Sequence, residues 1–247
     1  HQVRQALPEV AVPELPDAPE HDAMLLQAAG YFESVQFTDD DLRRAELYQQ
    51  SAARKAELVV TGDLAGHLAS LDMVAELSAF DALGRARITQ LINKTNQFNL
   101  TTRRRSELEV AALEHDPSAV TLQVRLRDRF GDNGMICVVI GLQAGDDLLI
   151  DTWLMSCRVL NRGVERAVLN ELVDAAKARS IRRLVGRYLP TAKNALVSGH
   201  YAGLGFVALA DPAEPAGDQP LWVLDLADRL PLPCQVRTLR PALSNGA

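Results

Sequence analysis

The stretch 150–165, "IDTWLMSCRVLNRGVE", decides the fold that this sequence predicts. Its apolar first half has the length and composition of a strand, and its basic second half leads into a helix. Over residues 163–179 apolar side chains recur every four positions, and Glu165 near the start and Lys177 near the end suit the helix dipole. Cys157 stands between the two elements. The sequence therefore predicts a thiol in the turn that leads from a strand to a helix N-terminus.

Three strand patterns surround or precede this turn. In "SAVTLQVRLRDRFG" apolar and polar side chains alternate, and "NGMICVVIGL" and "LLIDTWLM" follow, joined by the hairpin-type loop "QAGDD". We therefore predict three neighbouring antiparallel strands over residues 120–155. A strand ("RLVGRYL"), a short helix ("PTAKNALVSGHYAGL") and two terminal strands ("GFVAL", "LWVLDL") come after the long helix. This order predicts the α/β class, with a mixed, largely antiparallel sheet and flanking helices from about residue 70 to 228.

The residues before this sheet have a different pattern. "HDAMLLQAAGYF" predicts a short helix that ends at Gly30. "TDDDLRRAELYQQSAARKAEL" predicts a longer one with Thr38 as its N-cap. Its apolar residues are few, so we expect it to pack on something that this chain does not fully contain. "DALGRARITQLINKTNQ" predicts a further helix capped by Asp81.

Composition excludes some function classes. Acidic residues outnumber basic ones, 32 to 26, and the formal net charge of −6 argues against a nucleic-acid binder. The three cysteines have no metal-ligand spacing, and their odd, sparse number suits a reducing compartment. No stretch reaches the roughly 20 apolar residues of a membrane helix, and the first residues lack a signal-peptide layout. We therefore expect a cytoplasmic protein that binds neither a membrane nor a metal.

Four blocks carry a resemblance to a known family: "NKTNQFNLTTRR", "DRFGDNG", "IDTWLMSCRVLNRGVE" and "PTAKNALVSGHYAGLGF". Together they resemble the C-terminal half of the FkbH-like proteins, in which a haloacid-dehalogenase-type phosphatase domain precedes a domain related to the GNAT acyltransferases. The early segment "VRQALPEVAVPELP" resembles the tail of that phosphatase domain. The resemblance implies two parts. Residues 1–68 are the tail of the phosphatase-like domain with a helical linker, and residues 69–247 are a GNAT-like acyltransferase domain.

The resemblance also implies an activity. FkbH-like proteins take a glyceryl group from a phosphorylated glycerate and pass it to the phosphopantetheine thiol of an acyl carrier protein, for polyketide-type biosynthesis. The phosphatase half of the family needs an Asp-x-Asp motif on a strand, and no such motif follows a strand here. We therefore expect an acyltransferase that is not a competent phosphatase, with an acyl carrier protein and a small phosphorylated glycerate as partners. Phosphopantetheine or coenzyme A would be the acyl acceptor.

Three residues are the catalytic candidates. Cys157 lies near a helix N-terminus and two arginines, which would favour the thiolate form that attacks an acyl group. His200 can act as a base near neutral pH. Tyr201 begins the ending Y-x-x-L-G-F, whose tyrosine in GNAT domains sometimes protonates a leaving thiolate. Packing is the alternative for each of the three: a small residue that ends a strand, a histidine at a helix end and a buried phenol.

The binding candidates fall into two groups. Arg158-x-x-Asn161-x-Gly163 resembles the phosphate-binding pattern of GNAT proteins, although Asn161 stands where glycine is usual. Asparagine tolerates a left-handed backbone, so the turn can persist. The expected ligands of the pantetheine arm are Arg158, Asn161, Arg162, Gly163 and Val164. The expected substrate-binding residues are Asn96, Gln97, Asn99, Asp151, Lys193 and Asn194, with Asp151 placed to orient His200 or Arg158.

Two other functions remain open. A coenzyme A-dependent N-acetyltransferase would transfer its acyl group directly and would not need the thiol of Cys157. A non-catalytic module that docks on a carrier protein would need neither the thiol nor a base. Of the other cysteines, Cys137 has the pattern of a core residue, and Cys234 lies in a proline-rich tail.

Overall fold

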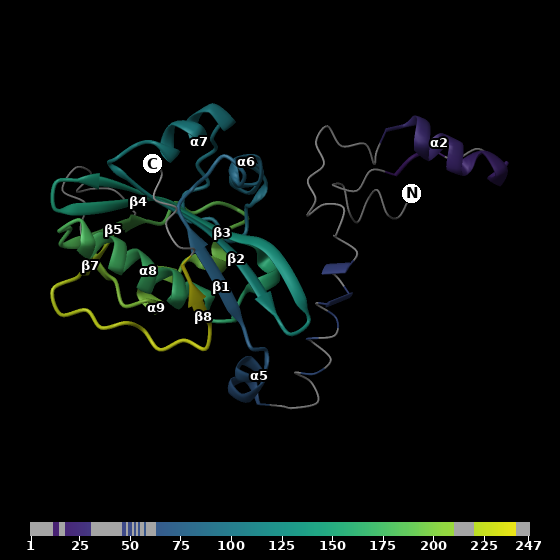
Figure 1. Cartoon of the computed structure of the whole chain (residues 1–247). Coiled ribbons are helices and arrows are strands. Elements are labelled where there is room, and N and C mark those ends of the chain that lie inside the picture. The colour runs from purple at the N-terminus through teal and green to yellow at the C-terminus, as the bar shows by residue number, and fades with distance from the viewer. Residues whose placement is uncertain are drawn as a thin grey trace. The chain divides into compact units, whose positions relative to one another are not determined.

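The computed structural model describes residues 12–14, 18–30, 46, 47, 49, 50, 52, 54, 57, 63–209 and 220–240. The chain divides into two compact units, residues 1–43 and 44–247. In the first unit the short turn η1 (Pro19–His21) leads into helix α2 (Asp22–Ala28) (Figure 1). Gly30 follows α2 with a φ of 66°, a left-handed conformation that glycine adopts without strain. The short helix ending at this glycine is confirmed.

The described part of the second unit contains an eight-stranded sheet in the order β6-β7-β5-β4-β3-β2-β1-β8. The strands are β1 (Val74–Ser78), β2 (Ala119–Asp128), β3 (Gly131–Ala144), β4 (Asp147–Met155), β5 (Arg183–Arg187), β6 (Val207–Leu209), β7 (Leu221–Asp225) and β8 (Arg237–Leu239). β4 and β5 are parallel, as are β1 and β8, and all other neighbours are antiparallel. The mixed, largely antiparallel α/β class and the three neighbouring strands β2, β3 and β4 are therefore confirmed.

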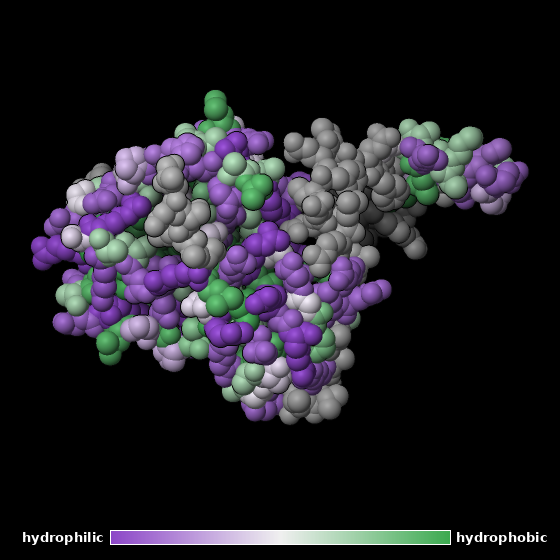
Figure 2. Space-filling view, viewed as in Figure 1, coloured by the Kyte–Doolittle hydropathy of each residue, from purple (hydrophilic) through white to green (hydrophobic). Residues whose placement is uncertain are grey.

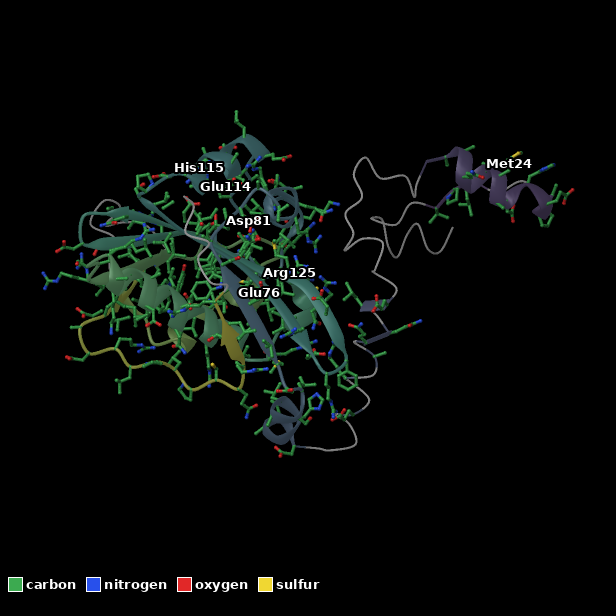
Figure 3. All side chains as sticks on the ribbon, viewed as in Figure 1. Met24, Glu76, Asp81, Glu114, His115 and Arg125 are labelled. Atoms are coloured by element: carbon green, nitrogen blue, oxygen red, sulfur yellow. The ribbon has the colours of Figure 1, made fainter. Side chains whose placement is uncertain are left out.

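Helices cover both faces of this sheet. They are α5 (Leu64–Ser70), α6 (Arg85–Lys94), α7 (Glu107–Glu114), α8 (Val164–Ala178) and α9 (His200–Gly203), with the 3-10 turns η2 (Cys157–Val159) and η3 (Ala195–Val197). One face forms a core with the apolar side of α8, and the other forms a second core with α6 and α7. Arg85 of α6 and Glu114 of α7 form a bidentate ion pair that joins these two helices. Figure 3 shows Glu114 on α7, and Glu76 beside Arg125 where β1 pairs with β2.

Several element boundaries differ from the sequence prediction. The helix predicted from Asp81 begins at Arg85, because Asp81 Oδ1 accepts a hydrogen bond from the Gly84 N–H and forms a preceding turn. The helix predicted over "PTAKNALVSGHYAGL" is divided into η3 and α9. Helix α7 and strand β8 were not predicted. The sheet therefore extends past residue 228, to Leu239.

The described residues of the segment 46–57 pack on this chain, contrary to the expectation from its sequence. Leu47 and Arg54 are buried, and Arg54 binds Asp128 at the end of β2. A side chain at Gly131, the first residue of β3, would collide with Gln50. The described residues Gln50 and Arg54 therefore lie against the β2–β3 turn, within the compact unit 44–247.

The surface of the second unit that Figure 2 presents is largely hydrophilic, with small hydrophobic areas between the charged side chains. Across the described part of the chain, no helix is both long enough and apolar enough to span a membrane.

Candidate functional site

The site lies where strands β4 and β5 stop pairing. Residues 147–150 of β4 pair with residues 183–186 of β5, and β4 then continues to Met155 without β5. The segment 98–100 takes the place of β5: Leu100 N donates to the Trp153 carbonyl at 3.1 Å, and Met155 N donates to the Phe98 carbonyl at 3.0 Å. The backbone of Phe98 is thereby held beside the end of β4.

The turn after β4 exposes the thiol of Cys157. Ser156 accepts hydrogen bonds at its Oγ from the Arg158 backbone N–H (3.4 Å) and from the Arg158 Nε (3.1 Å), and so caps η2. Cys157 is the first residue of η2 and is exposed. Cys137, in contrast, is fully buried, and burial raises the pKa of its thiol. The structure confirms the core position of Cys137, and it places Cys157 on the surface.

The turn continues into a helix N-terminus without a side-chain cap. Asn161 has a φ of 60° and Gly163 a φ of 76°, so both residues are left-handed. The conformation of Asn161 agrees with the expectation that asparagine can replace glycine here. Gly163 is the N-cap of α8, and the space beside it is open. Such an uncapped first turn has free N–H groups, which attract an anion.

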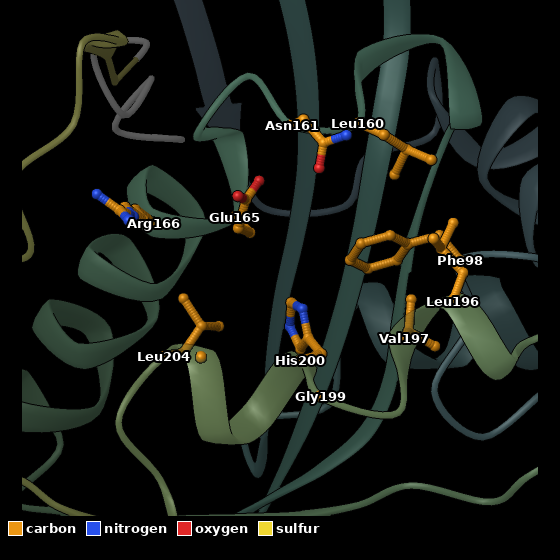
Figure 4. Close-up of a pocket in the computed structure, with 11 residues that line it drawn as sticks. Phe98, Leu160, Asn161, Glu165, Arg166, Leu196, Val197, Gly199, His200 and Leu204 are labelled. Atoms are coloured by element: carbon orange, nitrogen blue, oxygen red, sulfur yellow. The ribbon is translucent and has the colours of Figure 1, made fainter. Parts of the chain in front are cut away.

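A cavity of about 250 Å³, here called the His200 cavity, lies between this first turn of α8 and helix α9 (Figure 4). It is lined by Phe98, Leu160, Asn161, Glu165, Arg166, Leu196, Val197, Gly199, His200, Gly203 and Leu204. In Figure 4 Asn161 and His200 face each other across it, and the Phe98 ring enters from the side. Arg158 and Arg162 are not lining residues, and the ring of Phe98 packs edge-on against His200 at 5.1 Å.

His200 is neutral and has an unused ring nitrogen. Burial lowers the pKa of His200 to about 4, so the ring carries no charge at pH 7. Its Nε2 is buried, and no hydrogen-bond partner for it occurs among the described residues. Trp153 packs edge-on against the same ring at 4.6 Å. The unused nitrogen can hydrogen-bond a ligand in the cavity, because buried polar atoms are otherwise satisfied within a protein.

Tyr201 lies deeper and lines neither this cavity nor the next. Its ring packs against Phe206 and Trp222, and its hydroxyl oxygen is buried, again with no partner in the described part of the chain. Burial raises the pKa of Tyr201, so the phenol keeps its proton. A side chain at Gly186 of β5 would collide with the hydroxyl, so this glycine is what admits the ring.

A second cavity, of about 660 Å³, has Cys157 in its lining and is here called the Cys157 cavity. It is lined by Leu91, Lys94, Thr95, Asn96, Gln97, Phe98, Met155, Ser156, Cys157, Ala192 and Lys193. The structure thus brings together four of the predicted residues: Asn96, Gln97, Cys157 and Lys193. Cys157 and His200 line different cavities, and the one residue that both linings share is Phe98.

Two of the predicted substrate-binding residues hold loops together instead. Asn194 is fully buried, and its Nδ2 donates to the carbonyls of Asn99 and Leu189, each at 2.9 Å. Asn99 is also buried; its Nδ2 donates to the Thr95 carbonyl at 3.2 Å and its Oδ1 accepts from Thr102 N at 2.8 Å. These bonds occupy both amides, so the two residues position the segment that carries Phe98.

Asp151 contacts neither His200 nor Arg158. Its carboxylate accepts hydrogen bonds from Arg103 (2.5 Å), Arg105 (2.7 Å) and Thr152 (2.9 Å). It lines a different hollow of about 910 Å³, which lies over strands β4, β5, β6 and β7. The expected role of Asp151 in orienting the site is therefore wrong, because two arginines occupy its carboxylate.

Sequence reasoning missed the position of Phe98 and the partners of Arg162. Phe98 was given no role from the sequence, because nothing in the local sequence shows that it lines two cavities. Arg162 Nη1 donates to Asp128 Oδ2 at 3.1 Å, and Asp128 also binds Arg54.

In the described residues no group of three or more His, Cys, Asp or Glu side chains is arranged to hold a metal ion.

Comparison with known proteins yields solved structures but no sequence relatives. No protein-family model and no curated protein matches the chain. The ribosomal-protein-S18-alanine N-acetyltransferase from Escherichia coli is 16% identical, covers 63% of this chain and 96% of its own, and has a TM-score of 0.46. Spermidine N-acetyltransferase from Vibrio cholerae, in complex with CoA and spermine, is 14% identical, covers 63% and 96%, and has a TM-score of 0.45.

A third structure, the GNAT domain of S. lividans PAT, is 16% identical, covers 61% of this chain and 89% of its own, and has a TM-score of 0.47. Identities and TM-scores of this size decide nothing about substrate or activity.

Proposed function

We propose that the chain is an acyltransferase of the GNAT type that takes its ligand's pantetheine arm into the His200 cavity. The uncapped first turn of α8 supplies N–H groups for a phosphate at one end. The unused Nε2 of neutral His200 supplies a hydrogen-bonding atom further in. The observation that supports this proposal most is that His200 and residues from the first turn of α8, Glu165 and Arg166, line one cavity.

The exposed thiol supports a covalent route. The thiolate of Cys157 attacks the acyl carbon of the donor, a new thioester bond forms, and the donor's leaving group departs with the proton that Cys157 has lost. A phosphopantetheine thiol then attacks this thioester, takes the acyl group, and returns a proton to Cys157. Because Phe98 lies between the two cavities, the thiol end of the arm passes beside its ring to reach Cys157.

The resemblance to FkbH-like proteins suggests the identity of the acyl group and of the acceptor. On that basis we propose a glyceryl group, derived from a phosphorylated glycerate, as the acyl group and an acyl carrier protein as the acceptor. The Cys157 cavity suits a small polar acyl group, since Asn96, Gln97 and Lys193 line it.

Direct transfer from coenzyme A to an amine is the second candidate function. It is favoured by the separation of Cys157 and His200, because no hydrogen bond joins the thiol to this base in the described residues. In a direct transfer the His200 cavity would hold coenzyme A, and Cys157 would carry no acyl group.

Intact-protein mass spectrometry distinguishes the two routes. After incubation with glyceryl-coenzyme A, we expect one glyceryl adduct on the wild-type chain, none on Cys157→Ala, and an undiminished adduct on the control Cys234→Ala. Cys157 should also react with iodoacetamide before the buried Cys137. Release of coenzyme A without an adduct, and only when an amine is added, would favour direct transfer.

A further inference from the structure

A buried ion cluster lies behind the turn that carries Asn161. Its centre is Asp128, the last residue of β2, whose side chain is fully buried. Arg54 Nε and Nη2 donate to its two oxygens, each at 2.8 Å, and Arg162 Nη1 donates to Oδ2 at 3.1 Å. Asn133 Nδ2 (3.1 Å) and Phe130 N (2.9 Å) complete the shell of donors.

Among the described residues, this cluster has more positive than negative charge. Two guanidinium groups share one carboxylate, and the side chains of Arg54 and Arg162 are only 5% and 10% exposed. Burial, together with the charge of Arg54, lowers the pKa of Arg162 to about 10, which still leaves it protonated at pH 7. A buried charge without a counter-charge is costly, so an anion close to the cluster is stabilised.

Arg162 connects the cluster to the turn itself. Its Nη2 donates to the Arg158 carbonyl at 2.7 Å, so the side chain closes the turn from within. The neighbouring Asn161 and Gly163 are both left-handed. A left-handed non-glycine residue costs on the order of 1 kcal/mol or more and persists only where its surroundings hold it in place. Arg162 faces Asp128, while Asn161 lines the His200 cavity.

We infer that Arg54 and Asp128 are positioning residues, which hold Arg162 and so make turn 158–163 selective for a ligand that carries a phosphate. The inference rests on the proposed function, because it requires a pantetheine arm in the His200 cavity. It assigns a role in ligand selection to Arg54, which precedes the sheet by about twenty residues. Coenzyme A and phosphopantetheine have the phosphate, and free pantetheine does not.

The test compares coenzyme A and pantetheine binding by calorimetry on the full chain. Arg54→Gln removes one of the two positive charges from Asp128 and can still donate a hydrogen bond. We expect its affinity for coenzyme A to fall roughly tenfold or more, and its affinity for pantetheine to stay within about twofold. Arg54→Lys should recover part of the coenzyme A affinity, because it restores the charge without the bidentate geometry.

Arg129→Gln is the matched control. Arg54 and Arg129 both lie over the Phe130 ring, at 5.5 and 4.8 Å, but Arg129 pairs with Glu57 instead of Asp128 and is partly exposed. Its replacement should leave both affinities unchanged.

Three outcomes would overturn the inference, and they are distinct. If folded Arg54→Gln binds coenzyme A as the wild type does, the cluster does not act on the turn. If it loses both ligands equally, Arg54 only stabilises the fold. If the wild type binds neither ligand, the proposed function fails, and this inference fails with it.

Discussion

Two carboxylates of the sheet, Asp128 and Asp151, are each bound by two arginines, yet their surroundings differ. Asp128 is fully buried, with both of its arginines at most 10% exposed. Asp151 is 9% exposed; of its arginines, Arg105 is equally buried, but Arg103 is 60% exposed. One carboxylate and two arginines thus form a fully buried cluster at Asp128 and a cluster with one exposed arginine at Asp151.

The difference shows that burial sets the strength of such a cluster. A water-exposed arginine gains little from an ion pair, because solvent already stabilises its charge. Inside the fold, a charge that loses its partner has no solvent to replace it. Removing the charge of Asp128 should therefore destabilise the fold strongly. Removing the charge of Asp151 should destabilise it less.

Asp128→Asn tests this comparison with the largest expected effect. It leaves two buried guanidinium groups without a counter-charge, so we expect unfolding free energy to fall by about 3–5 kcal/mol. Urea denaturation followed by circular dichroism measures it. Asp132→Asn is the control: Asp132 lies in β3 near Asp128 and its side chain is 42% exposed, so this change should alter stability by less than about 1 kcal/mol. Similar losses in the two variants would contradict the comparison.

Asp151→Asn should cost less, about 1–3 kcal/mol at pH 7, because it loses charge-assisted hydrogen bonds at a partly exposed site. Burial opposes ionisation of Asp151, but the hydrogen bond and charge of Arg105 outweigh it and lower the pKa of this carboxyl. A lowered folded-state pKa gives stability above the unfolded value of about 4 and loses it as the pH falls through the folded value. The stability difference between wild type and Asp151→Asn should therefore shrink as the pH is lowered from 7 to 3. A constant difference would mean that the charge of Asp151 contributes nothing.

Arg103→Gln should have the smallest effect, below about 1 kcal/mol, because its side chain is 60% exposed. The same measurement on Arg105→Gln should give a larger loss, since Arg105 is buried beside Asp151. Equal losses would show that exposure does not distinguish these two ion pairs. Added salt should weaken the Arg103 contribution first.

Local sequence patterns were enough to predict those helices and strands whose own residues show a clear helical or strand periodicity. The period of α8 and the alternation of β2 follow from which side chains face the core, so both were predicted. Helix α7 was missed although its signal is present: Ser106 and Glu109 form a capping box, with Glu109 N donating to Ser106 Oγ at 3.3 Å.

Contacts between distant residues could not be predicted in the same way. Arg54 and Asp128 are 74 residues apart, and neither has a neighbour in sequence that indicates the other. The pairing of residues 98–100 with β4 depends on where β5 leaves it, which is a property of the sheet and not of the segment. For the same reason Cys157 could be placed in a turn from sequence, whereas its separation from His200 could not.

The short strand β8 has a consequence for how molecules of this protein meet in solution. It pairs with residues 74–76 of β1 and so occupies backbone groups that would otherwise form a bare sheet edge. A bare edge is a template for pairing with the strand of another molecule, and short edge strands prevent this. Although it spans only Arg237–Leu239, we expect β8 to protect this edge against pairing with another molecule, so that its loss first appears as reduced solubility.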